Sequence, residues 1–248
     1  MPKSQMNTTL NYSPNFDLKK RSVKEVKFII YHYTGMKKEN QAITRLTNSK
    51  SKVSSHYLIK NNGEILTLVP DLYVAWHAGV SSWKNYKSIN KYSIGIEISN
   101  PGHEYSYKKF SKKQIKSILK LSTYLRKRYK IKSNFILGHS DIAPDRKKDP
   151  GEKFPWKYLS KNKIGYWHNL NEKKLFKKRN LTADKKEKII FIKNLYEIGY
   201  PKNILINKYK YSKMLITAFQ RRFRQELVNG IIDQECLFIS NNLAKNLK

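Results

Sequence analysis

Short apolar or alternating runs rich in β-formers recur through the first two thirds of the chain and predict strands. They cover residues 26–33, 55–60, 64–69, 93–99 and 134–138. An Asn-Asn-Gly turn at 61–63 separates the second run from the third, which is typical of a hairpin. The strict alternation of SIGIEIS predicts that the side chains of Gly95, Glu97 and Ser99 share one face of a strand.

Helical periodicity occurs between the last two of these strands and again near the C-terminus. Ser111 and Gln114 form a capping box at the start of a helix expected over 111–130. Beyond residue 186, three segments have apolar residues at helical spacing, with glycine-containing breaks between them. We therefore predict an α+β fold, with a mixed central β-sheet flanked by helices and followed by a small three-helix domain.

These patterns divide the chain into four predicted parts. Residues 1–24 are polar and mostly unpatterned, and are expected to form a loosely ordered N-terminal arm. The sheet-containing domain is expected over 25–168 and a basic linker over 169–185. The helical domain is expected over 186–248.

The charge of the chain admits two interpretations. The 248 residues include 51 Lys+Arg and 18 Asp+Glu, which gives a formal net charge of +33. This charge suits a polyanionic partner, or it reflects a coding bias toward lysine, asparagine and isoleucine spread over solvated surface. The sequence has no helix-turn-helix, RNA-recognition or zinc-finger signature, so no specific nucleic-acid partner is predicted.

Other classes of protein and site are excluded by simple counts. No run of about 18 apolar residues occurs, so no membrane span is predicted. The N-terminal residues lack the apolar stretch of about 7–15 residues that a standard secretory signal contains. The single cysteine, Cys236, excludes an internal disulfide framework and a cysteine-based zinc cluster. A metal site in this chain would therefore use histidine and carboxylate ligands.

Two of the six histidines lie where strands are expected to end. His32 is near the end of the run 26–33, and His139 directly follows the run 134–138. Neighbouring strands would place both side chains at the same end of a sheet, where ligand sites are common. Two histidines and one carboxylate would leave a position on zinc open for water. Prolines and glycine turn the next segment back toward His139, but spacing alone does not choose between Asp141, Asp145, Asp149 and Glu152.

Two further features have both a structural and a functional interpretation. Glu97, on a face of small residues, is either exposed to solvent or lines a groove with room for a substrate. The segment 76–79 (WHAG) is an aromatic–histidine loop that forms either a groove wall or a packing corner.

Taken together, five blocks in a fixed order resemble the zinc-dependent N-acetylmuramoyl-L-alanine amidases of the AmpD/AmiD type. They are IIYHYT, SSHYLI, LVPDLYVAWHAGVSSW, SIGIEISNPG and GHSDIAPDRKKDPGEKFPW, and they fall within about 26–168. The segment 216–237 resembles a peptidoglycan-binding helical domain, which favours the AmiD branch. The resemblance implies hydrolysis of the amide between the lactyl group of N-acetylmuramic acid and L-alanine of the stem peptide, by a zinc-activated water.

The resemblance also assigns roles to residues. It implies one Zn²⁺ per chain, held by His32, His139 and Asp149. It implies that Glu97 is the general base and that Lys147 stabilises the oxyanion. His56 is expected to be structural. Contacts with the substrate are expected from His77, Trp76 and Arg146.

The implied partners are peptidoglycan or muropeptides, and the protein is expected to be a monomer. The wall-binding-like domain favours the periplasm or cell envelope, whereas the lack of a visible signal peptide or lipoprotein cysteine favours the cytoplasm. The alternative hypothesis is a catalytically inactive cell-wall or polyanion binding protein on an amidase fold. A decayed enzyme would be expected to have lost at least one of His32, Glu97, His139, Lys147 and Asp149, and all are present.

Overall fold

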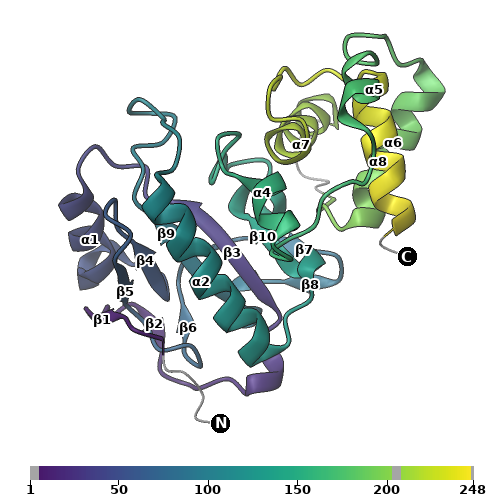
Figure 1. Cartoon of the computed structure of the whole chain (residues 1–248). Coiled ribbons are helices and arrows are strands. Elements are labelled where there is room, and N and C mark those ends of the chain that lie inside the picture. Colours follow the sequence, from purple (N-terminus) through teal and green to yellow (C-terminus); the bar gives the residue numbers. More distant parts are fainter. Residues whose placement is uncertain (1–5, 203–207, 247–248) are drawn as a thin grey trace.

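A six-stranded mixed β-sheet forms the centre of the protein (Figure 1). The computed structural model describes residues 6–202 and 208–246. In spatial order the strands are β1 (Thr9–Leu10), β5 (Ile65–Thr67), β4 (Tyr57–Ile59), β9 (Ser93–Ile98), β3 (Phe28–Tyr33) and β10 (Ile136–Gly138). Strands β4, β9, β3 and β10 are parallel, so their carboxyl ends meet at one edge of the sheet. The predicted hairpin is present as the antiparallel pair β4 and β5.

Two small antiparallel pairs and a set of helices complete the described part of the chain. The pairs join β2 (Phe16–Asp17) to β6 (Val74–Ala75) and β7 (Ser82–Trp83) to β8 (Tyr86–Lys87). The helices are α1 (Glu39–Thr47), α2 (Lys112–Tyr129), α3 (His139–Ile142), α4 (Trp156–Lys161), α5 (Glu172–Phe176), α6 (Lys185–Ile198), α7 (Lys208–Phe223) and α8 (Gln234–Asn246). Helix α2 begins with the predicted capping box, in which the Ser111 hydroxyl accepts the Gln114 N–H.

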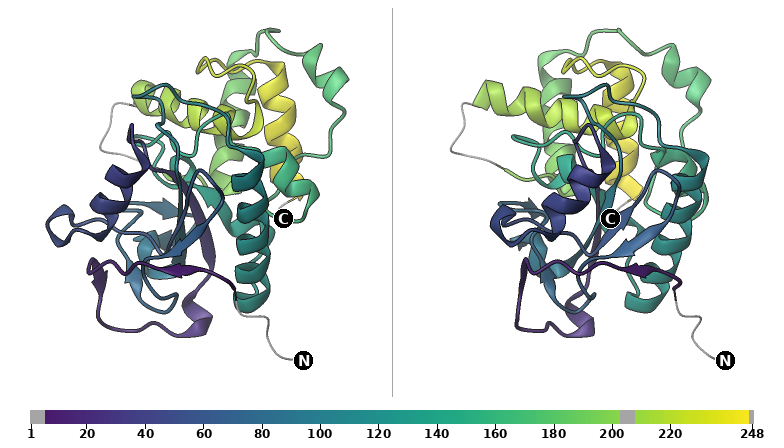
Figure 2. Two further views of the ribbon diagram at one scale, coloured as in Figure 1. Left: turned by 60° about the vertical axis from the view of Figure 1, so that its left-hand side comes forward. Right: turned by 90° about the vertical axis from the view of Figure 1, so that its left-hand side faces the viewer.

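Alternation along the central strands separates two hydrophobic cores. Ile29 and Tyr31 of β3 pack in the cluster that α2 covers, together with residues such as Leu121. Phe28 and Ile30 face the other side and belong to a cluster that includes Phe191, Phe219 and other residues of α6, α7 and α8. Figure 2 shows α2 along the sheet and the C-terminal helices, green to yellow, gathered on one side of it. The predicted fold class is confirmed, and the helical part shares a core with the sheet.

The N-terminal arm differs from the expectation of a loosely ordered segment within its described part, residues 6–24. Strand β1 pairs with β5, and β2 pairs with β6. Arg21 is buried, and its guanidinium donates to the carbonyl oxygens of Asp71 and Asn90. Because these bonds join residues 50–69 positions apart, local hydrophobic periodicity does not reveal them. Residues 1–5 lie outside the described residues.

The segment expected to be a linker, 169–185, contains helix α5 and packs on the helical part. Leu175 is buried in the shared core, and Thr182 forms a β-bridge with Asp233. The three predicted C-terminal helices are present as α6, α7 and α8. Among the residues described, no helix is both long enough and apolar enough to cross a membrane.

Candidate active site

His32 and His139 meet at the carboxyl edge of the parallel strands, as predicted. Strand β10 pairs with β3 in a register that places Gly138 beside Tyr31. The residue that follows each of these two in the chain is a histidine, so both histidines lie at the same end of the sheet. The two Nδ1 atoms lie 2.9 Å apart, and both rings are buried.

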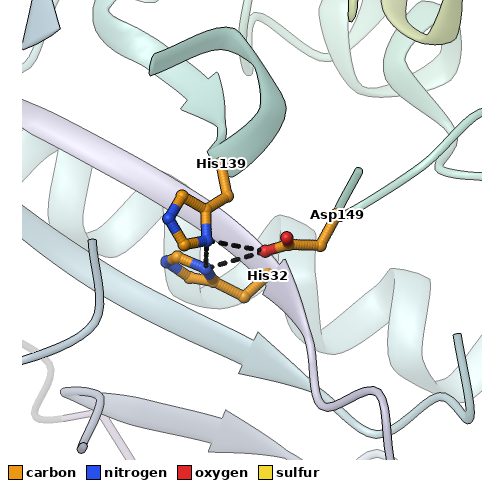
Figure 3. A group of neighbouring side chains, drawn as sticks. All are labelled: His32, His139 and Asp149. Carbon is orange, nitrogen blue, oxygen red and sulfur yellow. Dashed lines mark hydrogen bonds and ion pairs between the residues drawn. The ribbon is translucent and has the colours of Figure 1, made fainter. Parts of the chain in front are cut away.

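The loop after His139 folds back and brings the Asp149 carboxylate beside both rings (Figure 3). A backbone hydrogen bond from Ser140 N–H to Asp149 O, 2.9 Å long, closes this loop. The Asp149 Oδ2 atom lies 2.9 Å from His32 Nδ1 and 3.0 Å from His139 Nδ1. The geometry therefore selects one of the four carboxylates that spacing alone left open.

The other three carboxylates have different environments. Asp141 accepts the backbone N–H of Gly138 and forms a buried ion pair with Arg222. Glu152 pairs with His103 at 3.0 Å. The half-buried Asp145 borders a different hollow, beyond the 79–82 loop. Asp141 and Glu152 are thus engaged by partners of their own, and Asp145 lies on a different hollow.

The second nitrogen of each histidine is also engaged. His139 Nε2 lies 3.1 Å from the carbonyl oxygen of Ala78, to which only an N–H can donate. The Nδ1 of a neutral His139 therefore carries a lone pair toward Asp149. His32 Nε2 lies 3.0 Å from His77 Nδ1. Both imidazoles are thus fixed by neighbouring groups, a common arrangement for metal ligands.

These three side chains fit a zinc ion. One ligand atom each from His32, His139 and Asp149 lies within 4.8 Å of the others, and all three residues are buried. Two imidazole nitrogens and one carboxylate oxygen are a donor set typical of catalytic zinc. Three protein ligands leave a fourth position for water or substrate.

A pocket of about 390 Å3 opens over these three residues, and Glu97 and Lys147 line it too. Glu97 reaches the pocket because β9 pairs with β3 in a register that sets it beside His32. Its Oε2 atom is buried and has no hydrogen-bond partner among the described residues. A buried carboxylate oxygen without a partner is costly, so a site for a proton or a water at this atom is expected.

Charges around the pocket shift the protonation of its groups. Burial, and then the charge of Asp149, raise the pKa of Glu97 well above its usual value, against the opposing effects of Lys147 and Arg45. Burial, and then the neighbouring His139, lower the pKa of His32 to about 4. The histidine is therefore neutral, as a metal ligand must be, and the carboxylate has a strong affinity for a proton.

The predicted substrate contacts have different outcomes. His77 and Arg146 line the pocket, but the Arg146 guanidinium donates to the carbonyl oxygens of Ala78 and Val80. The structure does not place Trp76 on this pocket: its indole N–H donates to Asp17, and it borders the hollow beyond the 79–82 loop. His56 is structural as expected, because its Nδ1 accepts the backbone N–H of Gly95.

Two features of the site were not predicted. The space beside Gly95, considered as room for substrate, is filled by the His77 ring: a Cβ on Gly95 would lie 2.5 Å from His77 Cγ. Arg45 of α1 is exposed and lines the pocket. The apolar residues of 39–50 have only weak helical spacing, so the sequence does not show which face of this segment meets the strands that carry His32 and Glu97.

Comparison with known proteins agrees with this geometry. The model of a family described as N-acetylmuramoyl-L-alanine amidase matches residues 22–152. The chain is 33% identical over 232 residues to the N-acetylmuramoyl-L-alanine amidase AmiD of Escherichia coli, covering 89% of this chain and 83% of that protein. It is 40% identical to the 1,6-anhydro-N-acetylmuramyl-L-alanine amidase AmpD of Haemophilus influenzae over 44% of this chain and 58% of that protein.

Two solved structures extend the similarity to the whole chain. The E. coli AmiD structure, a complex with the substrate anhydro-N-acetylmuramic acid-L-Ala-D-γ-Glu-L-Lys, has a TM-score of 0.79 with 32% identity and covers 90% of both chains. AmpDh3 from Pseudomonas aeruginosa in complex with anhydromuramic pentapeptide has a TM-score of 0.78 with 28% identity. That match covers 100% of this chain and 98% of the other.

Proposed function

Since the chain belongs to the N-acetylmuramoyl-L-alanine amidase family, we propose that His32, His139 and Asp149 hold the zinc ion of such an enzyme. The protein is a hydrolase that acts on the amide between N-acetylmuramic acid and L-alanine. The proposal concerns how this chain's own residues carry out that reaction. The observation that supports it most is the convergence of His32 Nδ1, His139 Nδ1 and Asp149 Oδ2 on one point of the pocket.

When bound, a zinc ion at this point lowers the pKa of water and polarises the substrate carbonyl. Glu97 is proposed to receive the proton of the attacking water at Oε2, the buried oxygen that lacks a partner. The raised pKa of Glu97 then suits the second half of the task, which is delivery of that proton to the leaving amine of L-alanine. Acid–base catalysis of this kind contributes about 10²–10⁴-fold.

Lys147 is proposed to face the oxygen of the scissile carbonyl. It lies in the same pocket and is close enough to His32 and Glu97 to affect the pKa of both. An ammonium group in a partly enclosed pocket stabilises the negative charge that develops on this oxygen. The tetrahedral oxyanion forms as the water oxygen attacks and collapses when the C–N bond breaks.

Arg45 and Arg146 differ in their freedom to bind the stem peptide. The Arg146 guanidinium is engaged by two backbone carbonyls, so we assign it to holding the loop at 78–80. Arg45 lies on the pocket wall, and no hydrogen bond from its guanidinium is found within the described part of the chain. We therefore propose that Arg45, rather than Arg146, binds a carboxylate of the stem peptide.

The substrate is proposed to be a muropeptide or a peptidoglycan strand. The structures of AmiD and AmpDh3 were solved with anhydromuramyl peptides bound, which are ligands of the muropeptide class. We further propose that the helices of 186–248 contribute affinity for the wall polymer, with the excess of lysines favouring encounter with acidic stems.

Digestion of a defined muropeptide by the purified full chain, followed by mass spectrometry, tests the proposal. We expect release of a peptide that begins with free L-alanine, loss of this activity with a chelator and its return with zinc. Undiminished activity after zinc has been removed to below a tenth of an equivalent would contradict the metal assignment. Retention on purified sacculi without cleavage would instead support the inactive binding protein.

A further inference from the structure

We propose that Ser93 and His77 form a hydrogen-bond relay that fixes the tautomer of His32 and so points the lone pair of its Nδ1 at the metal. The inference rests on the proposed zinc site and assigns a positioning role to two residues that do not contact the metal. The relay runs from the backbone carbonyl of Ile89 through Ser93 and His77 to His32. In each hydrogen bond, the donor is determined by the bond before it.

The relay begins at a backbone carbonyl. The Ser93 hydroxyl lies 2.7 Å from the carbonyl oxygen of Ile89, and only the hydroxyl has a hydrogen to donate. Its single proton is therefore used in this bond. Ser93 Oγ also lies 3.0 Å from His77 Nε2, and in that contact the oxygen must accept. His77 consequently carries its proton on Nε2.

The position of the proton on His77 determines the tautomer of His32. The His77 ring is buried, and burial favours the neutral imidazole, so a proton on Nε2 leaves Nδ1 with a lone pair. His77 Nδ1 lies 3.0 Å from His32 Nε2 and accepts its N–H. His32 Nδ1 is then left unprotonated, at 2.9 Å from Asp149 Oδ2. The opposite tautomer would place a proton where a cation has to bind.

The fold provides space for the relay through Gly95. Ser93, Gly95 and Glu97 alternate along β9 and face the same side of the sheet. The His77 ring lies directly against Gly95, where a Cβ would come within 2.5–2.7 Å of three ring atoms. Strand β9 thus supplies Ser93 of the relay, the space at Gly95 for the His77 ring, and the proposed base Glu97.

The same short loop orients both histidines. His77 accepts from His32, and the carbonyl of the next residue, Ala78, accepts from His139 Nε2. The dipeptide His77-Ala78 thus accepts the Nε2–H of both histidines, and the lone pair of each neutral ring is left on Nδ1. Changes in such supporting groups typically cost about 10–100-fold in metal affinity.

The experiment compares four variants of the full chain, one of them a control, with the wild type. His77→Ala removes the acceptor for His32 Nε2–H, whereas His77→Asn offers its Oδ1 near the position of Nδ1. Ser93→Ala removes the directing hydroxyl. Ser99→Ala is the matched control, because Ser99 is a buried serine that follows the same strand and its hydroxyl has no partner in the described residues.

Two quantities are measured: zinc affinity by competition with a chelator, and the tautomer of His32 in the zinc-free protein by ¹⁵N NMR of the imidazoles. We expect zinc binding about 10–100-fold weaker in His77→Ala, largely restored in His77→Asn and unchanged in Ser99→Ala. In the wild type His32 is expected to carry its proton on Nε2. In Ser93→Ala we expect a mixture of the two tautomers.

An Nδ1–H tautomer of His32 in the wild type would overturn the relay, as would zinc affinity in His77→Ala equal to that of the wild type. Equal weakening in His77→Asn and His77→Ala would show that His77 acts only through packing. Failure of the wild type to bind zinc would overturn the proposed zinc site instead, and the ¹⁵N measurement would still decide the direction of the relay.

Discussion

Arg222 and Asp141 form a buried ion pair that joins helix α7 to the turn from which His139 projects. Asp141 also accepts the backbone N–H of Gly138, and Arg222 donates to the carbonyl oxygen of Ile136. The guanidinium lies over the ring of Trp156, 4.2 Å from its centroid. The helical part of the chain therefore holds the end of β10 and the start of the metal-binding loop.

Arg222→Met is expected to destabilise the whole protein. The substitution leaves the Asp141 carboxylate buried without its cation, which typically costs about 3–5 kcal/mol. Urea unfolding checks the value. Lys157→Met is the control, since Lys157 pairs with Glu172 at the surface and such pairs contribute less than about 1 kcal/mol. Equal midpoints for the two variants would mean that the buried pair does not hold the loop.

The elements of the sheet could be predicted because local patterns determine them. Alternation and apolar runs identified β3, β9 and β10, and parallel pairing then brought His32 and His139 together. The choice of Asp149 could not be made from spacing. It depends on contacts made far along the chain, since Asp141 is engaged by a residue 81 positions away.

The shared core and the ordered N-terminal arm could not be predicted either, because both depend on contacts between residues far apart in the sequence. Phe28 and Phe191 belong to one hydrophobic cluster, but periodicity shows only that each faces inward, not what it faces. Nothing in the sequence distinguishes Arg21 from the many cations that are expected to be exposed. Its burial becomes understandable only when the carbonyl groups that receive it are known.

Asp149→Asn is expected to remove zinc, whereas Glu152→Gln is expected to retain it. Both replace a carboxylate by an amide of the same shape in one loop, but only Asp149 lies beside both histidines. Supporting groups alone change affinity by about 10–100-fold, so loss of a direct ligand should exceed this range. Metal content after dialysis measures the difference. Zinc retained in both variants would exclude Asp149 as a ligand.

Glu97→Gln is expected to keep stoichiometric zinc and to lower kcat by about 10²–10⁴-fold. A second expectation follows from the raised pKa of Glu97. A carboxyl with a folded pKa above its unfolded value contributes stability below the unfolded pKa, and that stability is lost as pH rises through the folded pKa. The neutral amide should therefore make the zinc-free protein more stable than the wild type at pH 7.

The control for this comparison is the same pair of proteins at a pH below 4, where the wild-type carboxyl is protonated in both states. The gain in stability measured by urea unfolding should disappear there. A gain of the same size at both pH values would mean that it comes from packing. Full activity in Glu97→Gln would exclude Glu97 as the base.

Arg45→Ala is expected to raise KM more than it lowers kcat. A hydrogen bond to a charged group contributes about 1.5–3 kcal/mol, which corresponds to roughly 10–100-fold. Steady-state kinetics on a muropeptide with free stem carboxylates provides the measurement, and an amidated stem provides the control. A KM that rises equally for both substrates would show that Arg45 does not bind the carboxylate.

Lys147→Met is expected to move the acid limb of the kcat/KM profile to higher pH. The charge of Lys147 lowers the pKa of Glu97, so its removal lets that pKa rise further. The base must be deprotonated to accept a proton from water, so activity falls as the pH decreases through the pKa of Glu97. In Lys147→Met this loss should begin at a higher pH.

The same variant should also lower the plateau of the profile by about 10²–10³-fold, because it removes a charge that stabilises the oxyanion. Lys148→Met is the matched control: Lys148 borders the same pocket but is exposed, and it is not among the charges that shift the pKa of Glu97. A lower plateau with an unmoved acid limb would mean that Lys147 acts on the oxyanion alone. A moved limb with an unchanged plateau would assign Lys147 to the tuning of Glu97 and leave the oxyanion without it.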